Sequence, residues 1–211
     1  MILSFGKYKG MKLSDIYLRD ESYLEWLSDQ PWFQLKNPKL YREISEILKE
    51  IRPPVAYNEE TTVIYTDGAC KNNGSKKAGK VRAGIGVHFP SRNKVQIPDV
   101  SERLFGHLTN NVAELIAIRK SLELCRDHGI HENIILYTDS GYALKCITAW
   151  YPQWVKQNTL KNKKNLEILK DISDLLEIVS VSFKHIKAHT GLKDEHSLGN
   201  ARADDLANKC L

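Results

Sequence analysis

The chain has no apolar run long enough to span a membrane, and no internal repeat or low-complexity segment. Its first residues, Met1 to Lys7, lack the extended apolar core of a secretory signal peptide. A membrane protein and a repeat architecture are therefore excluded, and we expect a cytoplasmic location without a membrane partner. The overall composition, 42% hydrophobic and 27% charged, is ordinary for a globular protein.

Cysteine is scarce, and charge of one sign does not dominate. The four cysteines are scattered and show no paired spacing typical of a metal site: Cys70, Cys125, Cys146 and Cys210. We therefore expect reduced thiols and no disulfide framework. The net charge of +5 permits a polyanionic partner without requiring one.

The first fifty residues have a pattern of their own. Phe5 to Gly10 predicts a glycine-containing hairpin or tight turn, and Asp20 to Asp29 predicts a short helix. Asn37-Pro38 is typical of a helix start, and apolar residues then recur at helical spacing up to Ile51. Arg52-Pro53-Pro54 ends that helix. We predict a small α-rich module over residues 1–52 and a linker over residues 53–61.

From residue 62 the pattern changes to that of an α/β domain, which we expect to extend to residue 211. Predicted strands cover 63–65, 82–89, 100–107, 133–138 and 179–186. Predicted helices cover 110–127, 140–150, 166–178 and 201–210. Three early strands followed by alternating helices and strands indicate a mixed five-stranded sheet with helices on both faces.

Four carboxylates interrupt or end segments that otherwise resemble buried core. They are Asp67 in Thr-Asp-Gly, Glu114 in Thr-Asn-Asn-Val-Ala-Glu, Asp139 in Tyr-Thr-Asp-Ser and Asp204 in Gly-Asn-Ala-Arg-Ala-Asp. Buried acids are costly unless a cation neutralises them, and hard divalent metals prefer carboxylate oxygen. We expect Asp67 and Asp139 at strand ends on one edge of the sheet, and Glu114 and Asp204 in first helical turns.

Each acid also has an ordinary structural interpretation. Asp67 before glycine suits a turn, and Asp139 before serine suits a helix cap. Glu114 and Asp204 suit the positive end of a helix. All four together favour a single metal site over four separate coincidences.

Residues 62–211 resemble type 1 ribonuclease H, because the four motifs occur in the family's order and spacing. The resemblance implies a ribonuclease H-like fold with strand order 3-2-1-4-5. It also implies an endonuclease that cleaves the RNA strand of RNA/DNA hybrids and leaves 5′-phosphate and 3′-hydroxyl ends. The four acids would hold two Mg²⁺ ions, with Mn²⁺ as a substitute, in two-metal-ion catalysis.

Within this resemblance, the family register selects Asp204 over its neighbour Asp205, which we expect to be a solvated helix residue. His189 matches the family's loop histidine, which assists proton transfer or product release. His196, in the loop predicted over residues 192–198, is a weaker alternative.

The family's substrate contacts also have counterparts. Polar groups expected to sense the 2′-hydroxyl are Cys70, Asn73, Asn110 and Asn111. Aromatic positions expected against the DNA strand are Tyr142, Trp150 and Trp154, although a helical tryptophan such as Trp150 is also typical of core. Thr109 and Asn162 match a phosphate pocket in which His107 replaces the usual arginine. Lys156, Lys161, Lys163 and Lys164 form a short basic stretch that suits DNA backbone contacts.

The first fifty residues resemble the small C-terminal module of exodeoxyribonuclease X-like proteins, on Phe5 to Gly10 and Tyr23 to Leu27. Lys7, Tyr8 and Lys9 suit contacts to nucleic acid, and a small packing module with exposed lysines is the alternative. For the whole chain we expect a monomer. The rival functions are a catalytically silent hybrid-binding protein and a DNA-cutting nuclease of the wider superfamily.

Overall fold

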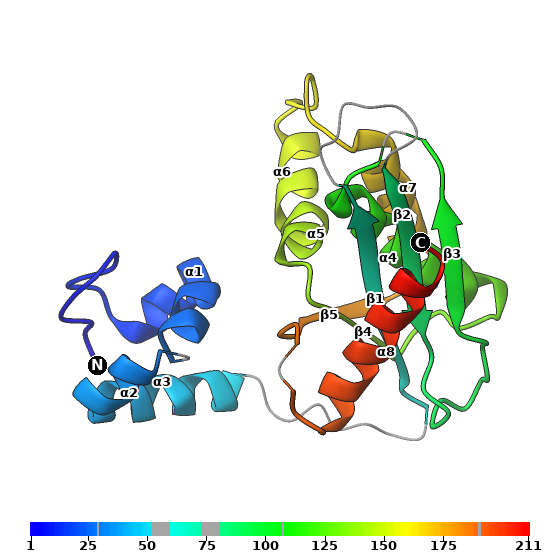
Figure 1. The fold of residues 1–211 in the computed structure, drawn as a ribbon. Helices are drawn as coiled ribbons and strands as arrows, with labels where there is room; N and C mark the ends of the chain where they lie inside the picture. The colour runs from blue at the N-terminus through cyan, green and yellow to red at the C-terminus, as the bar shows by residue number, and fades with distance from the viewer. Residues whose placement is uncertain (29, 52–59, 73–80, 107, 190) are drawn as a thin grey trace. The chain divides into compact units, whose positions relative to one another are not determined.

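A computed structural model describes residues 1–28, 30–51, 60–72, 81–106, 108–189 and 191–211 (Figure 1). The chain forms two compact units, Met1–Tyr57 and Asn58–Leu211. Among the described residues, no helix is both long and apolar enough to cross a membrane.

The first unit is a small helical fold with its own core. Its helices are α1 (Leu13–Ser28), α2 (Pro31–Lys36) and α3 (Pro38–Ile51). They enclose the buried side chains Leu3, Leu13, Ile16, Leu24, Leu27, Phe33, Leu40 and Ile44. Helix α1 begins earlier than the predicted helix at Asp20, and Asp20 itself has non-helical backbone angles that kink it.

The predicted glycine turn is present at the start of this unit. Ile2 and Lys12 form an antiparallel bridge, and the segment between them reverses direction. The Leu3 N–H donates to the Met11 carbonyl at 2.9 Å. Gly6 and Gly10 have φ angles of +73° and +87°, which L side chains rarely adopt, so glycine is required at both places.

The second unit contains the predicted mixed sheet, with strand order β3-β2-β1-β4-β5. The strands are β1 (Thr62–Lys71), β2 (Arg82–His88), β3 (Val100–Leu104), β4 (Ile134–Thr138) and β5 (Val181–His185). β1 is antiparallel to β2 and parallel to β4. β4 is short and fully buried, as expected for a central parallel strand.

Helices cover both faces of this sheet (Figure 1). A side chain on Gly68 of β1 would collide with α4 (Asn110–Asp127). Tyr65, three residues earlier on the same strand, instead meets Gly199 of α8 (Glu195–Lys209). Because side chains alternate between the faces of a strand, α4 and α8 lie on opposite faces. α7 (Leu166–Leu176) packs beside α4.

Two helices of the second unit differ from their predictions by more than two residues or in type. The last helix begins at Glu195, not at residue 201, because the Asp194 carboxylate accepts the backbone N–H groups of His196 and Ser197 and caps it. The helix predicted over 140–150 consists of α5 (Gly141–Lys145), a π-helical turn η1 (Cys146–Trp150) and α6 (Tyr151–Lys156). The wider π turn is invisible to a search for the 3.6-residue period.

β1 approaches α4 closely at Gly68. A Cβ atom there would lie 2.2 Å from the Glu114 backbone nitrogen and 2.4 Å from the Ala113 carbonyl carbon. We expect Gly68→Ala to force strand and helix apart and to destabilise the unit by about 1–3 kcal/mol. Thermal unfolding measures this effect. The control is Gly141→Ala, whose Cβ would meet only His185 Nε2, at 3.8 Å; an equal loss in both variants would contradict the packing argument.

Candidate active site

The parallel pairing of β1 and β4 brings the first two acids together. The ladder ends with Thr66 opposite Thr138, so Asp67 and Asp139 are the next residues on neighbouring strands. Asp139 follows its strand as predicted. Asp67 is not at a strand end, because β1 continues to Lys71 in its pairing with β2. The two acids therefore meet where the parallel pairing of β1 with β4 ends, and not at the end of both strands as predicted.

The other two acids come from helices on opposite faces of the sheet. Glu114 lies on α4 and Asp204 on α8. The expectation that both occupy first helical turns is wrong: the first turn of α4 has no acid, and that of α8 has Glu195 instead. The helix dipole therefore does not account for either residue, and the ordinary interpretation of both acids as dipole partners is excluded.

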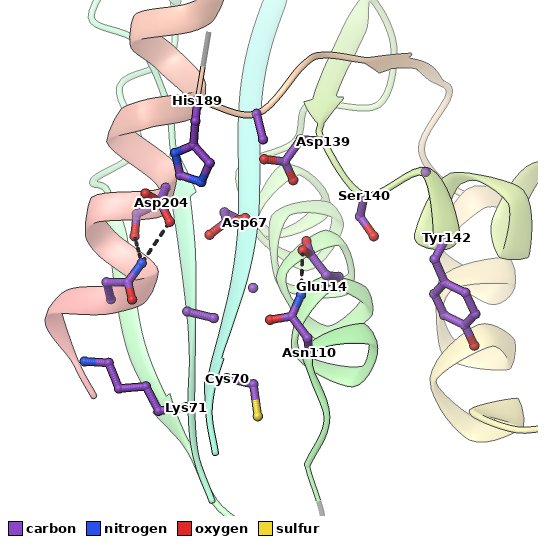
Figure 2. A pocket seen from close by; sticks show the side chains of 15 residues that line it. Asp67, Cys70, Lys71, Asn110, Glu114, Asp139, Ser140, Tyr142, His189 and Asp204 are labelled. Atoms are coloured by element: carbon purple, nitrogen blue, oxygen red, sulfur yellow. Dashed lines mark hydrogen bonds between the residues drawn. The ribbon is translucent and has the colours of Figure 1, made fainter. Parts of the chain in front are cut away.

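All four acids line one open cleft of about 540 Å³. Figure 2 shows Asp67 at its centre, with Asp204 on one side and Asp139 and Glu114 on the other. One carboxylate oxygen from each of Asp67, Glu114 and Asp139 can be chosen so that the three lie within 4.8 Å of one another. That spacing is suited to carboxylates that share a cation.

Charge repulsion and burial both act on these acids. Burial, then the neighbouring charges of Asp139 and Asp204, raise the pKa of Asp67 to about 7. Burial, then the charges of Asp67 and Asp139, raise the pKa of Glu114 to about 9. Without a cation, the site therefore resists full ionisation near neutral pH.

Hydrogen bonds hold three of the four carboxylates in place. Asn110 Nδ2 approaches Glu114 Oε1 at 3.4 Å, and Asn200 Nδ2 donates to Asp139 Oδ2 at 3.1 Å. Asn208 Nδ2 donates to Asp204 Oδ1 at 2.8 Å. Glu114 Oε2 is buried and has no hydrogen-bond partner within the described part of the chain.

This donor set fits a divalent cation. An orphaned, buried carboxylate oxygen next to other carboxylates is costly, and a bound cation would satisfy it. Because the donors are all oxygens, they suit a hard divalent cation better than a softer metal.

The structure separates the two histidine candidates and the two adjacent aspartates. His189 lines the cleft (Figure 2). His196 is not in a loop but in the first turn of α8, where its Nδ1 lies 2.9 Å from the Tyr65 hydroxyl. Asp204 lines the cleft, whereas the exposed Asp205 does not.

The predicted substrate residues divide into three groups. Cys70, Asn110 and Tyr142 line the cleft with the acids. Five others do not: Thr109 caps α4 by accepting the Val112 N–H, Asn111 and Asn162 are exposed, and Trp150 and Trp154 follow Tyr142 outside the cleft. Asn73 and His107 lie outside the described residues.

An aromatic row leads away from the cleft. Tyr142, at the cleft wall, meets Trp150 edge-on at 6.0 Å between ring centroids. Trp150 stacks on Trp154 at 6.3 Å, and Lys163 Nζ lies 4.9 Å from the centroid of the Trp154 ring. Trp150 is 37% exposed, so it is not a core residue. The π turn ends at this tryptophan.

Lys71, Asn200 and Asn208 are among the residues of the cleft region that were not predicted from the sequence. Lys71 and Asn208 line the cleft, and Asn200 holds Asp139 from a buried position. Asn200 belongs to the Gly-Asn-Ala-Arg-Ala-Asp motif, whose asparagine was the available signal. Lys71 carried no signal, because its placement depends on how far β1 extends. Asn208 lies four residues after Asp204 in the helix predicted over 201–210, and that spacing was the available signal.

Comparisons with known proteins match both units. A family model described as RNase H matches residues 59–211, and one described as the exodeoxyribonuclease X-like C-terminal region matches residues 3–30. A ribonuclease H1 of Rattus norvegicus is 34% identical over 158 residues, which cover 73% of this chain and 51% of that protein. The chain thus spans about half the length of that relative.

Two further relatives are matched over most of their own length. A ribonuclease H from a Cyanothece species is 34% identical over 71% of this chain and 88% of that protein. The solution structure of the prototype foamy virus (PFV) RNase H domain superposes with a TM-score of 0.57 at 27% identity, over 70% of this chain and 92% of that domain. Together with the five-stranded sheet and its acid cleft, these matches show that the chain belongs to the RNase H family.

Proposed function

We propose that this chain hydrolyses the RNA strand of RNA/DNA hybrids, with Mg²⁺ held by Asp67, Glu114, Asp139 and Asp204. The observation that carries the proposal is the convergence of three acid side chains within 4.8 Å in a domain of the RNase H family. The buried, unpartnered Oε2 of Glu114 supports it, since a cation would satisfy that oxygen.

The four acids that would hold the metal ions are carried by different strands and helices. Asp67 and Asp139 extend from paired strands, and Glu114 and Asp204 are fixed from α4 and α8. When bound, a pair of such ions activates water and stabilises the leaving oxygen in phosphodiester hydrolysis, to leave a 5′-phosphate and a 3′-hydroxyl. The amides of Asn110, Asn200 and Asn208 keep the carboxylates in place beforehand, which lowers the reorganisation needed for binding.

His189 is proposed to move protons at the mouth of the cleft. It is exposed and lines the cleft on the side of Asp204 (Figure 2). A histidine can accept or release a proton near neutral pH, and an exposed one can exchange it with water. It therefore suits proton transfer or product release, and its loss should slow turnover without abolishing it.

Recognition of the hybrid is proposed to use two sides of the cleft. Cys70 and Asn110 present small polar groups beside the acids, where they can contact the 2′-hydroxyl that marks the RNA strand. The row from Tyr142 through Trp150 to Trp154 offers ring faces to the deoxyribose of the DNA strand, and Lys163 lies at its outer end. Asn73, Thr109, Asn111 and Asn162 remain predicted contacts.

A substrate panel tests this proposal. The purified chain is incubated with Mg²⁺, and separately with Mn²⁺, on labelled RNA/DNA hybrid, single-stranded RNA, double-stranded RNA and duplex DNA. We expect cleavage only of the RNA in the hybrid. Hybrid binding without cleavage under either metal would favour a silent binding protein, and cleavage of duplex DNA would favour a DNA nuclease; either result would overturn the proposal.

A further inference from the structure

The unit Met1–Tyr57 has two large aromatic side chains that are exposed to solvent. Trp26 is 51% exposed and Trp32 is 42% exposed, whereas the unit's core is built mainly from aliphatic side chains. Large exposed rings that lie near one another favour association with a partner.

These rings are ordered around the glycine turn. Tyr23 packs edge-on against Tyr8, with ring centroids 5.0 Å apart, and lies 5.8 Å from Trp26. Phe5 meets Trp32 edge-on at 6.0 Å. Gly6 brings the turn against Tyr23, since a Cβ at Gly6 would lie 2.3 Å from the Tyr23 hydroxyl oxygen. The aromatic collar, which we define as Phe5, Tyr8, Tyr23, Trp26 and Trp32, is thus tied to the turn.

The turn that bears this collar is basic. Residues 1–12 contain Lys7, Lys9 and Lys12 and no acid. Lys7 is 4.8 Å from the Tyr8 ring centroid and also pairs with Asp20 at 2.9 Å, so part of its charge is neutralised. Lys9 is exposed and forms no ion pair with any residue that the structure describes.

Arg19 adds a second cation beside the collar. Its guanidinium carbon lies 6.0 Å from the Tyr8 ring centroid, and its side chain is exposed. Asp20 also accepts the Tyr8 hydroxyl at 2.7 Å, which fixes that ring in place. The ring of Tyr8 is therefore held in place, with the cations of Lys7 and Arg19 beside it.

We propose that the aromatic collar and its lysines form a second nucleic-acid site, which binds single-stranded DNA. Open ring faces stack on bases that are not already stacked in a duplex, and lysines contact the phosphates between them. A single strand fits better than a duplex, whose base faces are covered. DNA fits better than RNA because deoxyribose packs on an aromatic ring without stranding a 2′-hydroxyl.

The test measures binding of the full chain to fluorescein-labelled oligonucleotides by anisotropy, in chelator so that nothing is cut. The main probe is an oligothymidylate of about 20 nucleotides, longer than the 4–16 nucleotides typical of such sites. Trp26→Ser should weaken its binding by about five- to tenfold, because it removes one stacking ring. Lys9→Glu should weaken it by a similar factor, because it replaces a phosphate contact with a repelling charge. Leu35→Ser is the matched control, because Leu35 is 82% exposed and outside the collar.

Three further probes complete the experiment. We expect oligouridylate and duplex DNA to bind more weakly, and blunt RNA/DNA hybrid to bind each variant within about twofold of the unmodified chain. Circular dichroism checks that the Trp26 variant is folded, and Lys9→Glu keeps the test valid if it is not. The inference fails if neither variant loses affinity, if Leu35→Ser loses as much, or if RNA binds as well as DNA. Because no cleavage is measured, these outcomes are independent of the proposed nuclease activity.

Discussion

Asp67→Asn is expected to lower hybrid cleavage by at least about 1,000-fold, because metal-ion catalysis supplies several kcal/mol and each 1.4 kcal/mol changes a rate tenfold. Asp67 lies between Asp139 and Asp204, so losing its charge affects the whole set of carboxylates. Asparagine keeps the shape of the side chain. Hybrid affinity in the absence of metal should therefore change by no more than a few-fold.

Single-turnover cleavage and anisotropy with the same hybrid separate these two effects. The matched control is Asp205→Asn, the same chemical change on an exposed neighbour of Asp204 that does not line the cleft. It should leave the cleavage rate nearly unchanged. Turnover within tenfold of the unmodified chain for Asp67→Asn, or an equal loss for Asp205→Asn, would show that Asp67 does not hold the metal.

The second large effect concerns stability and pH. The pKa of Glu114 is raised from 4.5 to about 9, above its value in the unfolded chain. Between about pH 4.5 and about pH 9, the folded state therefore binds more protons than the unfolded state. The free energy of unfolding falls as the pH rises through this range. Asp67, with its pKa raised from 3.8 to about 7, contributes in the same direction over the lower part of the range.

Glu114→Gln should remove the larger part of the pH dependence of the free energy of unfolding. Without metal, the unmodified chain should lose on the order of a few kcal/mol between about pH 5 and about pH 9, and the variant clearly less. For a domain of this size that difference corresponds to a shift in Tm of roughly 5 °C or more. Added Mg²⁺ should restore the stability of the unmodified chain at high pH more than that of the variant, since cation binding requires ionised carboxylates.

Thermal unfolding followed over pH, with and without Mg²⁺, checks this expectation. Glu132→Gln, at an exposed position, is the matched control and should follow the unmodified chain. A metal-free chain that gains stability as pH rises from 5 to 9 would contradict the raised pKa values of Asp67 and Glu114.

Much of the second unit could be predicted because two of its motifs, those of Asp67 and Asp139, come with buried strands. The apolar run before Asp139 indicated a central parallel strand, and the pairing of β1 with β4 then placed Asp67 beside it. The sheet order, the family and the resemblance of the first unit to the exodeoxyribonuclease X-like module are all confirmed.

Other features depended on contacts that sequence spacing does not encode. The start of α8 follows from the cap at Asp194, in a polar segment that has no apolar period. The π turn before Tyr151 changes the helical register, and the exposure of Trp150 depends on tertiary packing. The role of Asn200 appears only once α8 lies against the strand ends, because its partner Asp139 follows β4.

The most direct test of the central claim, that the four acids form a metal-dependent site for cutting RNA, is end-group analysis of a cleaved hybrid. A hybrid with labelled RNA is incubated with the chain in chelator, and Mg²⁺ is then added in excess. We predict no cleavage before the addition, and afterwards RNA fragments with 5′-phosphate and 3′-hydroxyl ends and an intact DNA strand. Cleavage that persists in chelator, or fragments that end in 2′,3′-cyclic phosphate, would contradict the account.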